Sequence, residues 1–363
     1  MSTVDSDAVS HDAAVNKEEA PNQRGELRFA LDLFGAWTKS EIGGVPFNRF
    51  ALPRAELGAY RDPTAPLGGE LRLEAIRSAG PQSLLGVDGD SLVFRLKRGW
   101  LYRRWSLGDH RLRLAAGLLM SPLIEGLQNL EGHRGAAPLL AESSGLFEAA
   151  ELGLSVSWRG RLFKRALLLR LMSSNGEGRR LPEQNEGKDT SLLLNAELWA
   201  RGTKRLSLLL MGREGSRGLA SAPAHRAVAA LAWEQRVVRI GGAAYQAWGF
   251  AGRGDWDQRA FEFWGSVAPF GLESPGLMGR YERQLIDQQF GTVSSASRFI
   301  AGLFFPLAAR TDHAGSESRL YLIYQQDMVD SALSPIPGLA AAGTGWQLSL
   351  RFALRFAEDG FIP

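Results

Sequence analysis

The feature that most constrains this sequence is a strict alternation of apolar and polar side chains near its end. Residues 346–356 alternate without a break over eleven positions. Successive side chains of a β-strand point to opposite sides of the sheet, so the apolar residues of this stretch share one face. A tilted strand crosses a bilayer in about 9–11 residues, whereas strands of soluble proteins are usually about half as long. The stretch therefore predicts a membrane-spanning strand.

The same alternation recurs along the chain. It is clear in residues 27–33, 92–97, 111–118, 151–158, 192–198, 205–210, 298–307 and 319–325, and less regular, with more Ala and Gly, in 54–60, 71–78, 226–234, 237–250, 259–270 and 277–287. The segments number about sixteen, an even count, as in single-chain bacterial barrels. We therefore predict an all-β fold, a transmembrane antiparallel β-barrel over residues 25–356. Residues 1–24 are expected to be a disordered leader or added sequence, and 357–363 a C-terminal tail.

The spacing of the segments supports this fold. Tight connections are expected at 107–109, 159–161, 201–204 and 235–236, and longer ones at 79–90, 121–144, 172–189, 213–225, 288–297 and 328–345. Outer-membrane barrels combine short periplasmic turns with longer external loops. If both termini are periplasmic, every long connection is predicted to lie outside.

Other fold and function classes find no support in the sequence. A membrane helix needs about 18 consecutive apolar residues, and the longest apolar run here, Phe299–Ala309, is shorter. The absence of cysteine excludes disulfides, thiolate metal sites and cysteine nucleophiles. The five histidines have no paired metal-ligand spacing, and no hydrolase or nucleotide-binding motif occurs in a fitting context. We expect no enzyme activity, no catalytic residues, no cofactor and no metal.

Charge and aromatic residues add two expectations. The net charge is only +3, and no basic cluster interleaved with aromatics indicates nucleic-acid binding. Eight tryptophans lie at or near strand ends, which suits an aromatic girdle at the membrane interfaces: Trp37, Trp100, Trp105, Trp158, Trp199, Trp233, Trp248 and Trp346. The expected location is the bacterial outer membrane, although residues 1–24 contain no apolar signal segment.

Four stretches give the chain a resemblance to the sixteen-stranded bacterial porins, and more loosely to the phosphate-selective porins. They are GGELRLEAIRSAGPQ, GDSLVFRLKRGWLYRRW, HRLRLAAGLLMSPL and GWQLSLRFALRF. The likeness is one of pattern and covers nearly all of the chain after Gly25. It implies a homotrimer, a terminal aromatic residue, which here is followed by residues 357–363, and a constriction loop after the fifth strand, where residues 121–144 lie.

A barrel of this size encloses water, so inward-facing positions can be charged, and arginine or lysine rings favour anions. Only six of the 42 Lys and Arg residues are Lys. The candidate pore-lining residues are Arg28, Asp32, Arg95, Lys97, Arg111, Arg113, Glu151, Glu197, Arg205, Arg298, Arg319, Arg351 and Arg355. The acids among them temper the preference for anions. Alternatively, these charges pair with one another across the wall or with lipopolysaccharide phosphates.

The candidate constriction loop carries polar groups that would narrow the pore if the loop folds inward: Glu125, Gln128, Asn129, Glu131, His133 and Arg134. An ordinary external loop is the alternative. The sequence favours a porin for passive diffusion of small hydrophilic or anionic solutes, in contact with outer-membrane lipid and lipopolysaccharide. A plugged, non-conducting barrel that acts as a scaffold or adhesin through its external loops or a periplasmic partner is the second hypothesis. A soluble β-sandwich or several small soluble β domains is the third.

Overall fold

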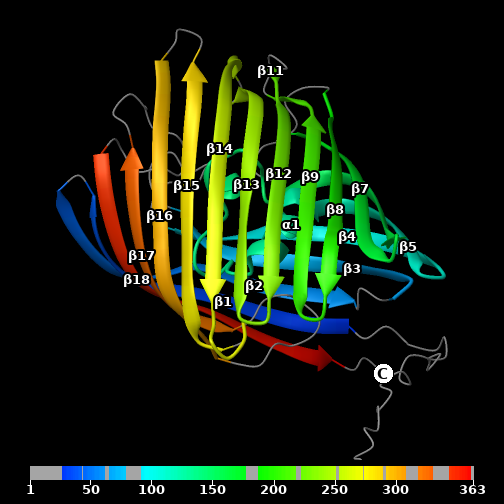
Figure 1. Cartoon of the computed structure of the whole chain (residues 1–363), viewed down its shortest axis with the longest axis horizontal. Helices are drawn as coiled ribbons and strands as arrows, with labels where there is room; N and C mark the ends of the chain where they lie inside the picture. Colours follow the sequence, from blue (N-terminus) through cyan, green and yellow to red (C-terminus); the bar gives the residue numbers. More distant parts are fainter. Residues whose placement is uncertain are drawn as a thin grey trace, which may run out of the picture.

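The computed structural model describes residues 27–42, 44–61, 65–78, 91–176, 187–217, 222–250, 253–272, 274–288, 292–307, 318–329 and 343–360. Sixteen antiparallel strands form one closed barrel, which confirms the predicted fold (Figure 1). Closure leaves no open sheet edge, as the absence of hydrogen-bonding partners in lipid requires. Neither helix of the described part is long and apolar enough to cross a membrane.

The barrel strands follow one another around the wall in chain order. They are β1 (Leu27–Ile42), β2 (Val45–Arg61), β3 (Leu67–Ser78), β4 (Ser91–Leu107), β5 (His110–Met120), β6 (Ala150–Leu162), β7 (Arg165–Ser174), β8 (Asp189–Arg201), β9 (Lys204–Glu214), β12 (His225–Gln235), β13 (Val238–Phe250), β14 (Arg253–Val267), β15 (Gly276–Gln288), β16 (Thr292–Pro306), β17 (Arg319–Val329) and β18 (Gly343–Gly360). The short strands β10 (Ser216–Arg217) and β11 (Ala222–Pro223) pair with each other between β9 and β12.

The first and last strands close the barrel. β1 pairs with β18 from Leu27 opposite Gly360 to Ile42 opposite Gly345. The last strand therefore continues beyond residue 356, where the sequence placed the end of the barrel. The first four residues of the expected tail, 357–360, belong to the wall.

Side chains alternate between the two sides of the wall as predicted. On β6, Leu152, Leu154 and Val156 are exposed on the outer face, whereas Ser155 and Ser157 are buried on the inner face. Strands β4, β9 and β17 repeat this arrangement. The apolar outer band suits contact with acyl chains, which supply no hydrogen-bonding partner.

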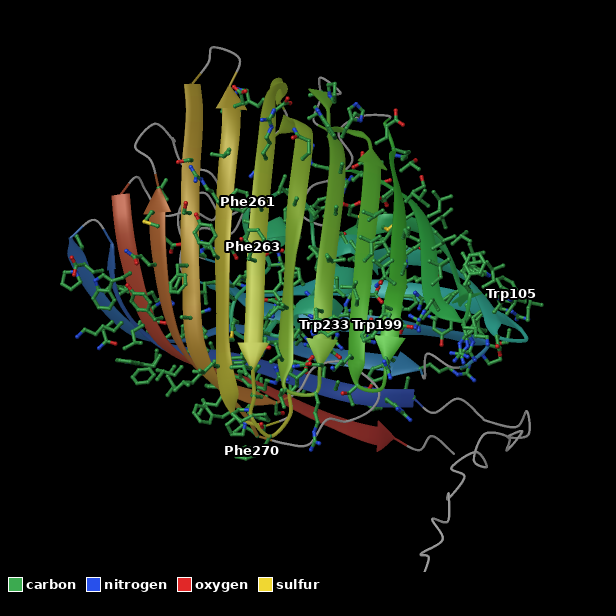
Figure 2. The ribbon with its side chains drawn as sticks, in the orientation of Figure 1. Trp105, Trp199, Trp233, Phe261, Phe263 and Phe270 are labelled. Carbon is green, nitrogen blue, oxygen red and sulfur yellow. The ribbon has the colours of Figure 1, made fainter. Side chains whose placement is uncertain are left out.

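Aromatic side chains gather at one end of this band. In Figure 2, Trp199 and Trp233 lie near the lower ends of β8 and β12, and Phe270 lies below β14. The Trp199 and Trp233 rings stack with centroids 5.4 Å apart. Trp100 is an exception to the predicted girdle, because it lines an internal cavity instead.

Four two-residue turns lie at one end of the barrel, here named the turn end: residues 108–109, 163–164, 202–203 and 236–237. The opposite end is the loop end. The turn predicted at 159–161 was wrong, because β6 continues to Leu162 and the chain reverses at Phe163 and Lys164. The long connection predicted at 288–297 was also wrong, because only residues 289–291 separate β15 from β16.

The predicted rule that every long connection lies at one end fails once. Residues 307–318 join β16 to β17 at the turn end, and this connection is as long as the loop-end connection of residues 79–90. Conversely, β1 joins β2 at the loop end through residues 43–44 alone. The sequence pattern fixes strand length more firmly than connection length, because each connection is free of the bilayer's dimensions.

The connection between β5 and β6, residues 121–149, is the one that matters for the interior. It contains α1 (Pro122–Glu131) and the short α2 (Leu140–Ser143). α1 lies inside the barrel, against β8, β9, β12 and β13 (Figure 1). The largest buried apolar cluster of the described residues is formed between this connection, here named the inner loop, and the barrel wall.

Candidate functional site

The inner loop is held in the lumen first by apolar packing. Leu123, Ile124 and Leu127 lie on one face of α1 and are completely or almost completely buried. They belong to one cluster with inward-facing residues of the wall such as Leu193 and Leu209. Burying each such side chain stabilises the packed loop by about 1.5–3 kcal/mol. The helix thus covers one side of the lumen and leaves the opposite side open.

The limits of α1 follow from its sequence. Pro122 occupies the first turn, where its missing N–H costs nothing. Gly132 ends the helix with φ of 77°, a conformation that glycine adopts without strain. A Cβ on Gly126 would lie 2.4 Å from Leu209, so glycine at this position permits the close approach of helix and wall.

Arginines of the wall then bind the inner loop through its backbone. Five of them donate hydrogen bonds to loop carbonyl groups: Arg226 to Leu146, Arg239 to Glu131, Arg280 to Pro138, Arg319 to Gly132 and Arg351 to Ala136. Arg319 and Arg351 were candidate pore-lining residues. The other three were missed, although their inward position could have been found once the phase of β12, β13 and β15 was known.

Two ion pairs fix the ends of α1. Glu125 accepts a hydrogen bond from Arg170 of β7 at 2.6 Å. Burial alone would raise the pKa of Glu125, but the Arg170 guanidinium outweighs it and lowers that pKa to about 2. Glu131 pairs with Arg280 of β15 at 2.8 Å. Burial raises the pKa of Glu131 in spite of this partner.

His133 lies beneath the loop and not in the open lumen. Its ring centroid is 4.7 Å from that of Phe304, and its Nδ1 atom lies 3.1 Å from Arg319 Nη1. Burial, together with Arg319, Arg239 and Arg280, lowers the pKa of His133 well below its usual value. A neutral ring whose Nδ1 accepts a hydrogen bond from Arg319 fits this environment.

A cavity of about 540 Å³ remains between the inner loop and the facing wall. Its charged lining comprises eight arginines, namely Arg61, Arg72, Arg98, Arg113, Arg134, Arg170, Arg239 and Arg319, and three acids, Asp32, Glu70 and Glu125. Gln128 and Asn129 also face it. Among the predicted loop residues, the structure thus brings Glu125, Gln128, Asn129 and Arg134 to one space, whereas Glu131 and His133 pack beneath the loop.

Many charges on the facing wall neutralise each other. Arg72 contacts Asp32 at 2.6 Å and Glu56 at 3.0 Å, and Lys97 also binds Glu56. In the same network Arg95 pairs with Glu74 at 2.7 Å and Arg98 with Glu70 at 3.1 Å. The predicted residues Asp32, Arg95 and Lys97 are therefore members of a paired network, as charges within membranes usually are.

The remaining predicted residues are dispersed along the wall. Glu151 pairs with Arg213 at 2.6 Å, Arg298 with Asp327 at 2.6 Å, Glu197 with Arg165 at 3.8 Å, and Arg205 with Glu234 at 3.1 Å. Arg28 is half-buried on β1, and Arg111 is exposed next to a turn. The side chain of Arg355 lies outside the described residues.

No other kind of site was found in the part of the chain that the structure describes. There, no group of three His, Asp or Glu side chains is placed to hold a metal ion. His110 stacks on Trp158 with centroids 5.4 Å apart. The inner loop and the cavity beside it are therefore the candidate site.

A closed sixteen-stranded antiparallel barrel with an apolar outer band is the fold of bacterial outer-membrane β-barrel proteins. The chain has this fold, and its location is the outer membrane. No family model matches the sequence, and no curated protein matches it.

Solved structures with the same fold cover almost the whole chain. An anion-selective porin from Comamonas acidovorans matches with a TM-score of 0.56, 15% identity and coverage of 90% of this chain and 98% of the porin. The trimer form of OmpT, an outer membrane protein of Vibrio cholerae, matches at 0.54 and 13%, covering 91% and 99%. OccK2 (OpdF) of Pseudomonas aeruginosa matches at 0.50 and 10%, covering 93% and 100%. At these identities the likeness concerns the fold.

Proposed function

We propose that the protein is a porin, without enzymatic activity, that lets small hydrophilic solutes diffuse passively and prefers anions. The observation that carries this proposal is the open cavity beside the inner loop, whose charged lining has eight arginines against three acids. A positive lining raises the local concentration of anions and lowers that of cations.

Unpaired arginines contribute most to such a field. Among the described residues, neither Arg113 nor Arg134 has a carboxylate within 4.0 Å, although both line the cavity. Arg134 extends from the inner loop and Arg113 from β5, so the two charges belong to different elements around the same space. The porin from Comamonas acidovorans, which has the same fold, is anion-selective, and this agrees with the proposal.

Planar-bilayer recording of the purified protein in a KCl gradient tests it. We expect ohmic single channels and a reversal potential whose sign shows that chloride is more permeant than potassium. Arg134→Gln should move the reversal potential toward zero, whereas Arg259→Gln, which removes an exposed charge from the outer face of β14, should leave it unchanged.

A barrel that inserts but does not conduct would contradict the porin. If deletion of residues 1–24 then restored conductance, the alternative of a plugged scaffold or adhesin would be supported. The cavity favours the porin, because the described residues leave it open.

We further propose a homotrimer in contact with lipopolysaccharide. The trimer form of the Vibrio OmpT supports the assembly. Small residues on the outer faces of β12 and β13, such as Ala229 and Ala244, would permit close subunit contact. Chemical crosslinking in native membranes should give a trimeric species, and only monomers would contradict this.

A further inference from the structure

Two rows of different character lie side by side on the inner wall of β4–β7. One row contains Tyr102, Ala115, Ser155 and Met172, which are direct neighbours across the four strands. The next row toward the turn end contains Arg104, Arg113, Ser157 and Arg170. The two rows are two residues apart along each strand, which is about 6.6 Å.

The first row is the centre of an apolar patch. Tyr102, Ala115, Leu119 and Met172 form a buried cluster, and Trp100 packs against it. All five line the cavity. Inward positions of a water-filled barrel are usually polar, so an apolar patch at this place in the lumen departs from the ordinary lining of a pore.

Trp100 is held in a defined position. Its indole N–H donates to Glu70 Oε2 at 3.2 Å, and its ring centroid is 5.4 Å from that of Tyr102. Gly117, opposite Trp100 on β5, has φ of 125°, and a Cβ there would lie 2.3 Å from the carbonyl oxygen of Gly99. Glycine is therefore required where β4 and β5 approach beside the indole.

Arg113 provides a cation at the edge of this patch. Its Cζ atom lies 5.4 Å from the centroid of the Trp100 ring. Among the described residues no carboxylate lies within 4.0 Å of it, whereas its neighbour Arg170 is paired with Glu125. The patch thus combines one guanidinium without an acid partner and an apolar surface that begins one row away.

We propose that this site binds organic monocarboxylates that have a compact apolar body, of the size of benzoate, in preference to small hydrophilic anions. The carboxylate contacts Arg113, and the apolar body lies on Trp100, Tyr102 and Leu119. The spacing of the two rows matches the distance between the carboxylate and the apolar body of such an ion. A cavity of about 540 Å³ lies in the usual range for small-molecule sites. This inference rests on the proposed function and names the solutes that the channel would favour.

Burial of the apolar body distinguishes these ligands. Arg113 attracts acetate and benzoate alike, because the charge-assisted hydrogen bond is the same for both. Only benzoate removes apolar surface from water when it meets the patch. The preference should therefore depend on Trp100, and the overall anion affinity on Arg113.

Isothermal titration of the detergent-folded full chain with benzoate and with acetate tests the binding directly. We expect tighter binding of benzoate. Trp100→Ala should weaken benzoate binding about tenfold and leave acetate unchanged, while Arg113→Gln should weaken both about tenfold or more. Trp248→Ala, on the outer face of β13, is the matched control and should change neither. Trp100→Phe keeps an aromatic ring and should retain most of the preference.

Bilayer recordings give a second readout. Benzoate should reduce the chloride current at concentrations at which acetate does not, and Trp100→Ala should abolish this block. Equal affinity for benzoate and acetate, or a preference that survives Trp100→Ala, would overturn the inference. A channel that conducts chloride without discriminating between the two acids would overturn the binding-site proposal and leave the proposed porin function standing. A barrel that binds benzoate but does not conduct would overturn only the proposed porin function.

Discussion

Arginine serves two purposes in this protein, and the difference lies in its partners. Arg319 and Arg351 donate to carbonyl groups of the inner loop, whereas Arg113 and Arg134 face the cavity without an acid partner among the described residues. The guanidinium can do the first because it presents several donors in a fixed plane. The sequence predicts which face of a strand an arginine occupies. It does not predict the partner, since partners come from strands and loops far along the chain.

The turn between β6 and β7 places two residues other than glycine in the left-handed backbone region. Phe163 and Lys164 have φ of 50° and 64°, values that disfavour residues with a side chain. Asn-Gly is the preferred pair for this type of turn. The double change Phe163→Asn with Lys164→Gly should raise the free energy of unfolding by about 1–2 kcal/mol in urea titrations of the reconstituted protein.

The turn between β8 and β9 offers a control of opposite sign. Gly202 has φ of 57°. A Cβ added at this residue would have no neighbouring atom within 4 Å. Gly202→Ala should therefore lower the free energy of unfolding by about 1 kcal/mol through backbone strain alone. Equal effects of both changes would show that the left-handed geometry does not set the stability of these turns.

At the scale of elements, the inner loop is the part of the structure that the sequence predicted least completely. Its position was predicted, but it ends at residue 149 and not at 144. Its helix was not predicted, although Leu123, Ile124, Leu127 and Leu130 have the spacing of an amphipathic helix. The direction in which a loop folds depends on the surface that awaits it. Here that surface, including Leu209 and Tyr245, is assembled by strands from distant parts of the sequence.

The packing of the inner loop should respond to pH through His133. Its pKa is lowered in the folded state, so the folded protein holds a neutral ring while the unfolded chain takes up a proton below about pH 6.5. The stability from this group is thus complete above pH 6.5. It is lost as the pH falls toward the folded pKa, at up to about 1.4 kcal/mol per pH unit.

Urea unfolding of the wild type and of His133→Gln between pH 7.5 and 4.5 isolates this contribution, and the two proteins should differ by about one proton taken up on unfolding. The wild type should lose stability more steeply on acidification than the variant. Identical slopes would show that the ring is protonated in the folded state or accessible to water there.

At the scale of the whole molecule, the strand count, the apolar outer band and the closed sheet could be predicted, because the bilayer imposes one period and one length on every strand. The placement of residues 307–318 at the turn end could not, because no such constraint acts on a connection. The depth of each outward side chain follows from the register.

This depth predicts how the membrane responds to a new charge. Leu154 lies on the outer face well inside β6, and Leu162 lies on the same face at the turn end. Leu154→Arg should lower the free energy of unfolding by about 2–4 kcal/mol, and Leu162→Arg by about 0–1 kcal/mol. Unfolding in phospholipid vesicles measures both. Equal costs would mean that the outer face of β6 is not in contact with acyl chains.

The pairing of Leu27 with Gly360 brings the two ends of the wall next to each other in space. Because the sheet is closed, the barrel does not depend on which connection between neighbouring strands carries the ends of the chain. A circular permutant in which residue 360 is linked to residue 27 and the chain opens at the turn of residues 202–203 should refold to the same barrel. Its single-channel conductance should equal that of the parent.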